Sequence, residues 1–158
     1  MFDMSLLQYG DLLVYSGGNP LSWAIKVKTW SSASHVEIYT ADNVSIGANK
    51  GGLKGRRFEE KHLYAVLRPA QPVDLQKAYA YWKTVEGQGY DTFGLLAFFR
   101  LGSGAKNKQI CSEFCINFYR AGGFDPFGPH CPSYNVSPSM FLTNNDFTWV
   151  WSKKEDKQ

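Results

Sequence analysis

The two halves of the chain carry different hydrophobic patterns, and this difference limits the folds that the sequence can adopt. In the first half, short apolar runs end at turn-forming residues, which is typical of β-strands. In the second half, apolar residues recur at the three- and four-residue spacing of helices. A chain whose strands precede its helices in this way predicts an α+β fold.

The expected strands cover residues 12–15, 36–40, 44–48 and 62–67, and a last strand passes through Trp149 and Val150. The expected helices begin after Asn19-Pro20 and cover residues 74–86 and 109–121, with a short helix near residues 138–142. Residues 92–101 are apolar nearly all round, so we expect them to be buried or to contact another molecule. The charged residues of the meander from Lys50 to Lys61 are mainly Lys and Arg, and we expect it to form a solvated strand surface. A rim that attracts an anionic substrate or lipid headgroups is the alternative.

Length and composition indicate the class of protein. The chain has 158 residues, which suits a single domain over residues 1–158. Hydrophobic residues make up 44% of it and aromatic residues 16%, which excludes an intrinsically disordered chain. The net charge of +3 is too small to predict nucleic-acid binding, and it leaves contact with a membrane surface open. The longest apolar run, residues 93–99, is too short to span a bilayer.

The cysteines and the first residues indicate the compartment. The first basic residue is Lys26, and Asp3 and Asp11 interrupt the start of the sequence, so the pattern of a secretory signal is absent. Three cysteines cannot form a complete set of disulfides. We therefore expect a cytoplasmic protein with free thiols, for which release at cell lysis stays open.

Cys111 lies at the start of the helix expected over residues 109–121. A helix N-terminus presents free N–H groups and the positive end of the helix dipole, which favour a thiolate and can hold an oxyanion. His35 lies where residues 31–34 enter a strand, and a fold can bring such a base to a cysteine that is distant in the sequence. By themselves these two residues favour a buried core thiol and a separate surface histidine. Nucleophilic catalysis is the alternative, which the motifs described below favour.

The other cysteines offer competing sites. Cys115 lies one helical turn beyond Cys111 and is expected to pack in the core. His130 and Cys131 lie between two prolines on a loop, where no helix start activates the thiol. A zinc site built from these four residues is a further alternative, but two cysteines at this spacing within one helix are a poor match for structural zinc ligands. We expect no metal and no cofactor.

Four short motifs follow one another along the chain. They are Tyr9-Gly10-Asp11-Leu12-Leu13, Ser34-His35-Val36-Glu37-Ile38-Tyr39, Gly89-Tyr90-Asp91 and Cys111-Ser112-Glu113-Phe114. In this order they resemble the circularly permuted branch of the NlpC-type papain-fold cysteine hydrolases, the YiiX-like family, which is related to the lecithin:retinol acyltransferases. The resemblance covers nearly the whole chain. It implies a permuted papain-like fold, in which an antiparallel sheet packs against helices and the Cys helix lies in the C-terminal half.

The resemblance also implies roles for individual residues. Cys111 would be the nucleophile, with its N–H as one arm of the oxyanion hole, and His35 would be the general base and acid. Tyr90 is similar to a tyrosine that points its hydroxyl at the oxyanion in unpermuted relatives, with an ordinary core aromatic residue as the alternative. Asp91 and Glu113 belong to the recurring motifs, and we expect them to hold the Cys helix in place by capping or ion pairing.

One position departs from the family pattern. Relatives orient the imidazole with a polar residue on the strand after the His strand, and here Gly47 occupies that position. Glu37 lies two residues after His35, so strand alternation points both side chains to the same face. We hypothesise that Glu37 replaces the missing partner. A solvated or ion-paired glutamate is the alternative.

The predicted function is cysteine-dependent hydrolysis of an amide bond, in a peptide or a cell-wall stem peptide, through an acyl-enzyme on Cys111. If Trp23, Trp30 and residues 93–99 line an acyl groove, the alternative is ester cleavage or acyl transfer on a lipid. A catalytically silent binding module on the same scaffold is a third hypothesis, which Gly47 keeps open. The expected partner is therefore a peptide-like or acyl-lipid substrate and not a nucleic acid.

Overall fold

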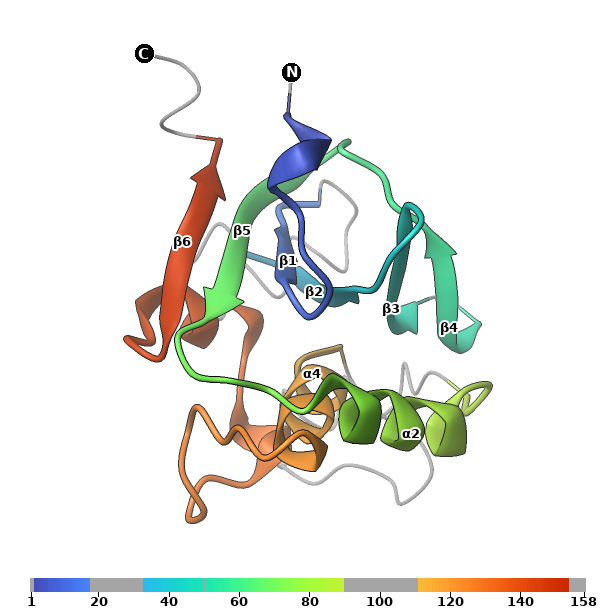
Figure 1. Ribbon diagram of the computed structural model, residues 1–158, viewed down its shortest axis with the longest axis vertical. Helices are drawn as coiled ribbons and strands as arrows, with labels where there is room; N and C mark the ends of the chain where they lie inside the picture. The colour runs from blue at the N-terminus through green and yellow to red at the C-terminus, as the bar shows by residue number, and fades with distance from the viewer. Residues whose placement is uncertain (1, 18–32, 50, 90–110, 154–158) are drawn as a thin grey trace.

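The computed structural model describes residues 2–17, 33–49, 51–89 and 111–153, and Figure 1 shows how these ranges are arranged. Together they form a six-stranded sheet. Its strands are β1 (Leu12–Tyr15), β2 (His35–Tyr39), β3 (Val44–Asn49), β4 (Gly52–Arg57), β5 (Leu63–Pro69) and β6 (Phe147–Ser152). With the helices described below, this sheet confirms the predicted α+β class.

The strands lie in the order β4-β3-β2-β1-β5-β6, and every neighbouring pair is antiparallel. All four residues of β1 are buried, because β2 and β5 pair with its two edges. Tyr15 at the end of β1 pairs with His35 at the start of β2, and Leu13 pairs with Glu37. The strand register therefore fixes the position of both predicted site residues of β2.

Two helices, α2 (Leu75–Val85) and α4 (Cys111–Ala121), lie on one face of the sheet (Figure 1). α2 begins after Asp74, whose carboxylate accepts a backbone N–H of the first turn as an N-cap. α2 buries the residues of one helical stripe, which are Ala78, Trp82 and Val85. α4 buries most of its side chains and contacts β2, β3 and α2. α4 is therefore the centre of the apolar core.

Strand alternation divides the sheet residues between two apolar clusters. Leu12 and Val14 of β1 belong to the cluster that contains the residues of α4. Leu13 and Tyr15 belong to the cluster on the other face. Because side chains of directly paired residues share a face, Glu37 and His35 lie on the same face as Leu13 and Tyr15.

Most of the described elements agree with the sequence-based predictions. β1 has the predicted bounds, and the other predicted strands and the helix α2 differ by one or two residues at their ends. The short helix near residues 138–142 is the 3-10 helix η3 (Pro138–Thr143). Two further 3-10 helices are η1 (Met4–Leu6) and η2 (Ser133–Asn135). The helix expected after Asn19-Pro20, residues 92–101 and residues 109–110 lie outside the described residues.

The basic meander contains a strand whose bounds the sequence did not predict. Gly51 and Gly52 have φ angles of 96° and 117°, which let the chain turn back so that β4 pairs with β3 along its whole length. Lys54 and Arg57 on β4 are exposed, as expected of a solvated surface, but Arg56 is only 29% exposed. Within the described ranges, every helix is too short or too polar to cross a bilayer.

Candidate active site

Cys111 lies at the first position of α4, next to β2, and is buried. The backbone N–H groups of Ser112 and Val36 both donate to its sulfur. The N–H of Val36 is available for this contact because the pairing of β2 with β3 does not extend from Ile38 to Val36. The sulfur therefore lies where backbone donors stabilise a thiolate.

His35 connects the thiol to β2. Its side chain is 21% exposed and forms a hydrogen bond with Cys111. Its Nε2 lies 3.0 Å from Oε1 of Glu37. Because Nε2 faces the carboxylate, Nδ1 is the nitrogen left for the sulfur, so the ring can accept the thiol proton on one side while the carboxylate orients it on the other.

Glu37 is fully buried, and four side chains contact its carboxylate. Oε1 lies 3.0 Å from Nε2 of His35, and it accepts Nδ2 of Asn49 at 2.6 Å and Nε of Arg56 at 2.8 Å. Oε2 accepts the hydroxyl of Ser45 at 2.6 Å. These donors satisfy both oxygens of a carboxylate that is out of contact with water, and they fix its direction toward His35.

Gly47 makes room for this carboxylate. The pairing of Ile38 with Ile46 places Gly47 opposite Glu37. A Cβ atom at Gly47 would lie 2.9 Å from Cγ of Glu37, a distance that requires one of the two to move. The space that a polar residue of β3 would occupy is therefore filled by the side chain of Glu37.

The ionisable groups shift one another's pKa values. Burial alone would raise the pKa of Glu37, but hydrogen bonds to and positive charges on His35 and Arg56 outweigh it and lower that pKa from 4.5 to about 2. Burial would lower the pKa of His35, but Cys111 and Glu37 outweigh it and raise that pKa from 6.5 to about 10. Burial would raise the pKa of Cys111, but His35 and the two backbone N–H groups lower it. At neutral pH the site therefore favours a thiolate beside an imidazolium.

The structure brings three of the predicted site residues, Cys111, His35 and Glu37, into contact. Glu113 lies in the first turn of α4 and is half-buried. Tyr90 and Asp91 lie outside the described residues.

The competing cysteines lie in different surroundings. Cys115 is fully buried, and burial together with the charge of Cys111 raises the pKa of its thiol well above 9.0. His130 is exposed and Cys131 is half-buried on a loop whose carbonyl at Cys131 accepts a hydrogen bond from Arg120. The zinc site considered for Cys111, Cys115, His130 and Cys131 does not form, because no group of three metal-ligating side chains is gathered among the described residues.

Three contacts of Glu37 were not predicted as part of the site: Ser45, Asn49 and Arg56. A signal for the hairpin was present, since Gly51 and Gly52, shortly after the strand expected over residues 44–48, are typical of a hairpin turn. Such a hairpin returns the chain along that strand and places its basic residues beside it.

No protein-family model and no curated protein matches this chain. Among solved structures, it is similar to the crystal structure of metalloprotein yiiX from Escherichia coli O157:H7, DUF1105. The TM-score is 0.70 and the sequence identity 22%, over 92% of this chain and 97% of that one. The two chains share a fold. The likeness extends over nearly the full length of both.

The neighbour is named a metalloprotein, which raises the question of whether the described site could hold a metal. Both oxygens of Glu37 accept hydrogen bonds from protein donors, and Nε2 of His35 faces one of them. Cys111 contacts the other side of the His35 ring, and no three His, Cys, Asp or Glu side chains in the described ranges are gathered so that they could hold one metal ion. The described residues do not fit a metal, so the chemistry of Cys111 is derived from protein groups alone.

Proposed function

We propose that this chain is a cysteine-dependent hydrolase with a YiiX-like, circularly permuted papain fold over residues 1–158. The observation that carries the proposal is the unbroken series of contacts from Cys111 of α4 through His35 to Glu37 of β2. A nucleophile, a base within hydrogen-bond reach and a third group that orients the base are the parts that thiol hydrolysis needs. The shared fold of the yiiX structure supports the YiiX-like fold in this proposal.

In the first step, the thiolate of Cys111 attacks the carbonyl carbon of the substrate, and a C–S bond forms as the carbonyl electrons move onto oxygen. The backbone N–H of Cys111, at the positive end of α4, is one arm of the oxyanion hole. By the family resemblance, the hydroxyl of Tyr90 is the other. The imidazolium of His35 gives its proton to the leaving amine as the C–N bond breaks, which leaves an acyl-enzyme.

In the second step, neutral His35 takes a proton from a water molecule, whose oxygen attacks the thioester carbonyl. The C–S bond then breaks, the acid product leaves, and the proton on His35 restores the ion pair with Cys111. Glu37 keeps the ring in place in both steps through its contact with Nε2.

The substrate we propose is an amide bond in a peptide, with a cell-wall stem peptide as the first to test. An acyl groove was expected to be lined by Trp23, Trp30 and residues 93–99, all of which lie outside the described residues. Lipid substrates are therefore an outcome of the test and not a second proposal. Gly47 no longer favours a silent binding module, because Glu37 fills the space of the missing side chain.

The experiment is labelling with a thiol-reactive, acyl-type probe, followed by identification of the labelled peptide. We expect selective labelling of Cys111 that His35→Ala abolishes. Cys131→Ser is the matched control, since that thiol is the half-buried one on a loop. Equal labelling of all three cysteines at ordinary thiol rates would contradict the proposal. Hydrolysis of stem peptides and of short acyl esters by the unlabelled enzyme then separates amide from lipid substrates.

A further inference from the structure

Glu37 has four side-chain partners, but one of them differs in carrying a permanent charge. Ser45 and Asn49 are neutral donors, and His35 is a cation only while it holds both ring protons. Arg56 stays charged at every working pH, and its Nε lies 2.8 Å from Oε1 of Glu37. A carboxylate that is fully buried, as this one is, needs a cation to remain ionised.

The charge of Glu37 matters for the thiol of Cys111 because Glu37 and the ring of His35 can hold the same proton. His35 supports the thiolate of Cys111 only as an imidazolium, with protons on both nitrogens. The proton on Nε2 points at Glu37, and a carboxylate of higher proton affinity would take it and leave a neutral ring. A cation beside Glu37 lowers that proton affinity, and so it keeps the positive charge on the ring.

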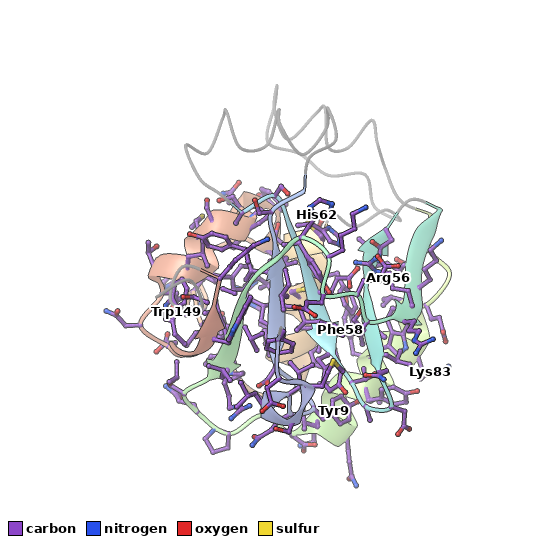
Figure 2. All side chains as sticks on the ribbon, turned by 90° about the horizontal axis from the view of Figure 1, so that it is seen from above. Tyr9, Arg56, Phe58, His62, Lys83 and Trp149 are labelled. Carbon is purple, nitrogen blue, oxygen red and sulfur yellow. The ribbon has the colours of Figure 1, made fainter. Side chains whose placement is uncertain are left out.

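We infer that Arg56 is a positioning residue of this site, which acts through Glu37 by holding its buried carboxylate ionised and directed at His35. The inference rests on the proposed function, because it gives Arg56 a part in the reaction of Cys111. Arg56 reaches the site from the edge strand β4, where Figure 2 labels it. Its guanidinium also lies 5.4 Å from the ring centre of Tyr15, which helps to fix its direction.

Other ionisable groups do not replace this charge. The groups that face Glu37 or Arg56 from neighbouring elements are Tyr15, His35, Glu59, Cys111 and Cys115. Burial raises the pKa of Tyr15 and of Cys115, so both stay neutral at neutral pH. Glu59 is 64% exposed, so water screens its contact with Arg56. Among the described residues, Arg56 is thus the cation that compensates Glu37 whether or not His35 is protonated.

The first test measures the rate at which iodoacetamide alkylates Cys111 at neutral pH, with the modified peptide identified by mass spectrometry. We expect Arg56→Met to slow this rate about tenfold, because a neutral ring leaves most of Cys111 as the unreactive thiol, and Arg56→Lys to restore most of it. Arg57→Met is the matched control, because Arg57 is the exposed neighbour on the same strand, and we expect the unchanged rate. In a Glu37→Gln background, Arg56→Met should slow the reaction no further. A wild-type rate in Arg56→Met, or an equal loss in both backgrounds, would overturn the inference.

The second test follows the carbon NMR signal of the Glu37 carboxyl as the pH is lowered. A packing role of Arg56 would leave this titration unchanged, whereas the inference requires it to move to higher pH in Arg56→Met and to return in Arg56→Lys. If Arg56→Met does not fold, the double variant with Glu37→Gln decides: folding of the double variant supports the inference, and failure of both contradicts it. If wild-type Cys111 reacts no faster than Cys111 in His35→Ala, the proposed function fails. The Glu37 titration would then still test the effect of Arg56 on this carboxylate.

Discussion

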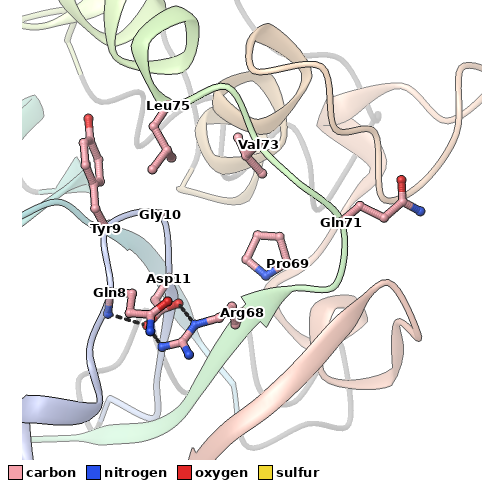
Figure 3. A pocket seen from close by; sticks show the side chains of 9 residues that line it. All are labelled: Gln8, Tyr9, Gly10, Asp11, Arg68, Pro69, Gln71, Val73 and Leu75. Atoms are coloured by element: carbon pink, nitrogen blue, oxygen red, sulfur yellow. Dashed lines mark hydrogen bonds and ion pairs between the residues drawn. The ribbon is translucent and has the colours of Figure 1, made fainter.

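Two buried carboxylates, Asp11 and Glu37, each pair with a partly exposed arginine, and the surroundings of the two pairs differ. Asp11, just before β1, is 1% exposed, and Arg68 of β5 binds its two oxygens at 2.8 and 2.9 Å (Figure 3). Its further partner is the backbone N–H of Gln8, and Arg68 also donates to the carbonyl of Leu6. This pair ties the N-terminal segment to β5, and no histidine or cysteine of the described ranges is among its hydrogen-bond partners.

The pair of Glu37 and Arg56 is equally buried on the carboxylate side, but the same oxygen of Glu37 also faces His35, which contacts Cys111. The two residues connected to this pair, His35 and Cys111, can therefore gain or lose a proton. The comparison teaches that a buried ion pair does not by itself mark a functional site. A connection to groups whose protonation changes is what distinguishes one pair from the other.

The largest expected effect separates the two pairs by reactivity. We expect His35→Ala to slow alkylation of Cys111 by about 10²–10⁴-fold, because the thiol loses both its base and the cation beside it. The rate is measured by peptide mass spectrometry, and the rates at Cys115 and Cys131 in the same sample are the internal controls. An unchanged rate at Cys111 would show that the pair of Glu37 and Arg56, like the pair of Asp11 and Arg68, only holds segments of the fold together.

The second prediction concerns the structural pair. Arg68→Met leaves Asp11 buried without its cation, so we expect the free energy of unfolding to fall by about 3 kcal/mol. Denaturant titration measures this change. The alkylation rate of Cys111 in the folded variant should stay at the wild-type value. A slower rate would show that both pairs support the thiol, and the distinction between them would fail.

A third prediction uses pH. The pKa of Glu37 is lowered from 4.5 to about 2 in the folded chain, so its ionisation stabilises the fold above pH 4.5, and this contribution is lost as the pH falls toward 2. Its size is about 3 kcal/mol. We therefore expect stability to fall more steeply with acid in the wild-type chain than in Glu37→Gln. Unfolding measured at several acid pH values gives the two slopes, and parallel curves would contradict the shift.

The smallest expected effect tests the space beside Glu37. Gly47→Ala should lower the free energy of unfolding by about 1–3 kcal/mol, because the new Cβ would press on the side chain of Glu37, and it should also slow alkylation of Cys111. Gly55→Ala on β4 is the control, since its Cβ would meet Val44 at an ordinary 3.5 Å. If both variants behave alike, the close approach at Gly47 has no bearing on the site.

Part of this site was accessible from the sequence. Cys111, His35 and Glu37 were predicted to lie together, and the structure places them in contact, while their catalytic roles stay proposals. Arg56 could not be chosen from the basic residues of its segment, because Lys54, Arg56 and Arg57 follow one another with few apolar residues to show which side faces inward. Only the hairpin register, which sets Arg56 opposite Ser45, turns it toward Glu37.

The sequence established the kind of most described elements, with β4, η1 and η2 as exceptions, because the spacing of apolar residues and the turn-forming residues act over a few positions. It also determined that Glu37 and His35 share a face, since alternation along a strand is local. That the start of β2 meets the start of α4, and that Arg56 is the cation beside Glu37, follows from the three-dimensional packing alone. Those contacts join segments far apart in the chain, and the packing of the whole sheet and its helices sets their distances.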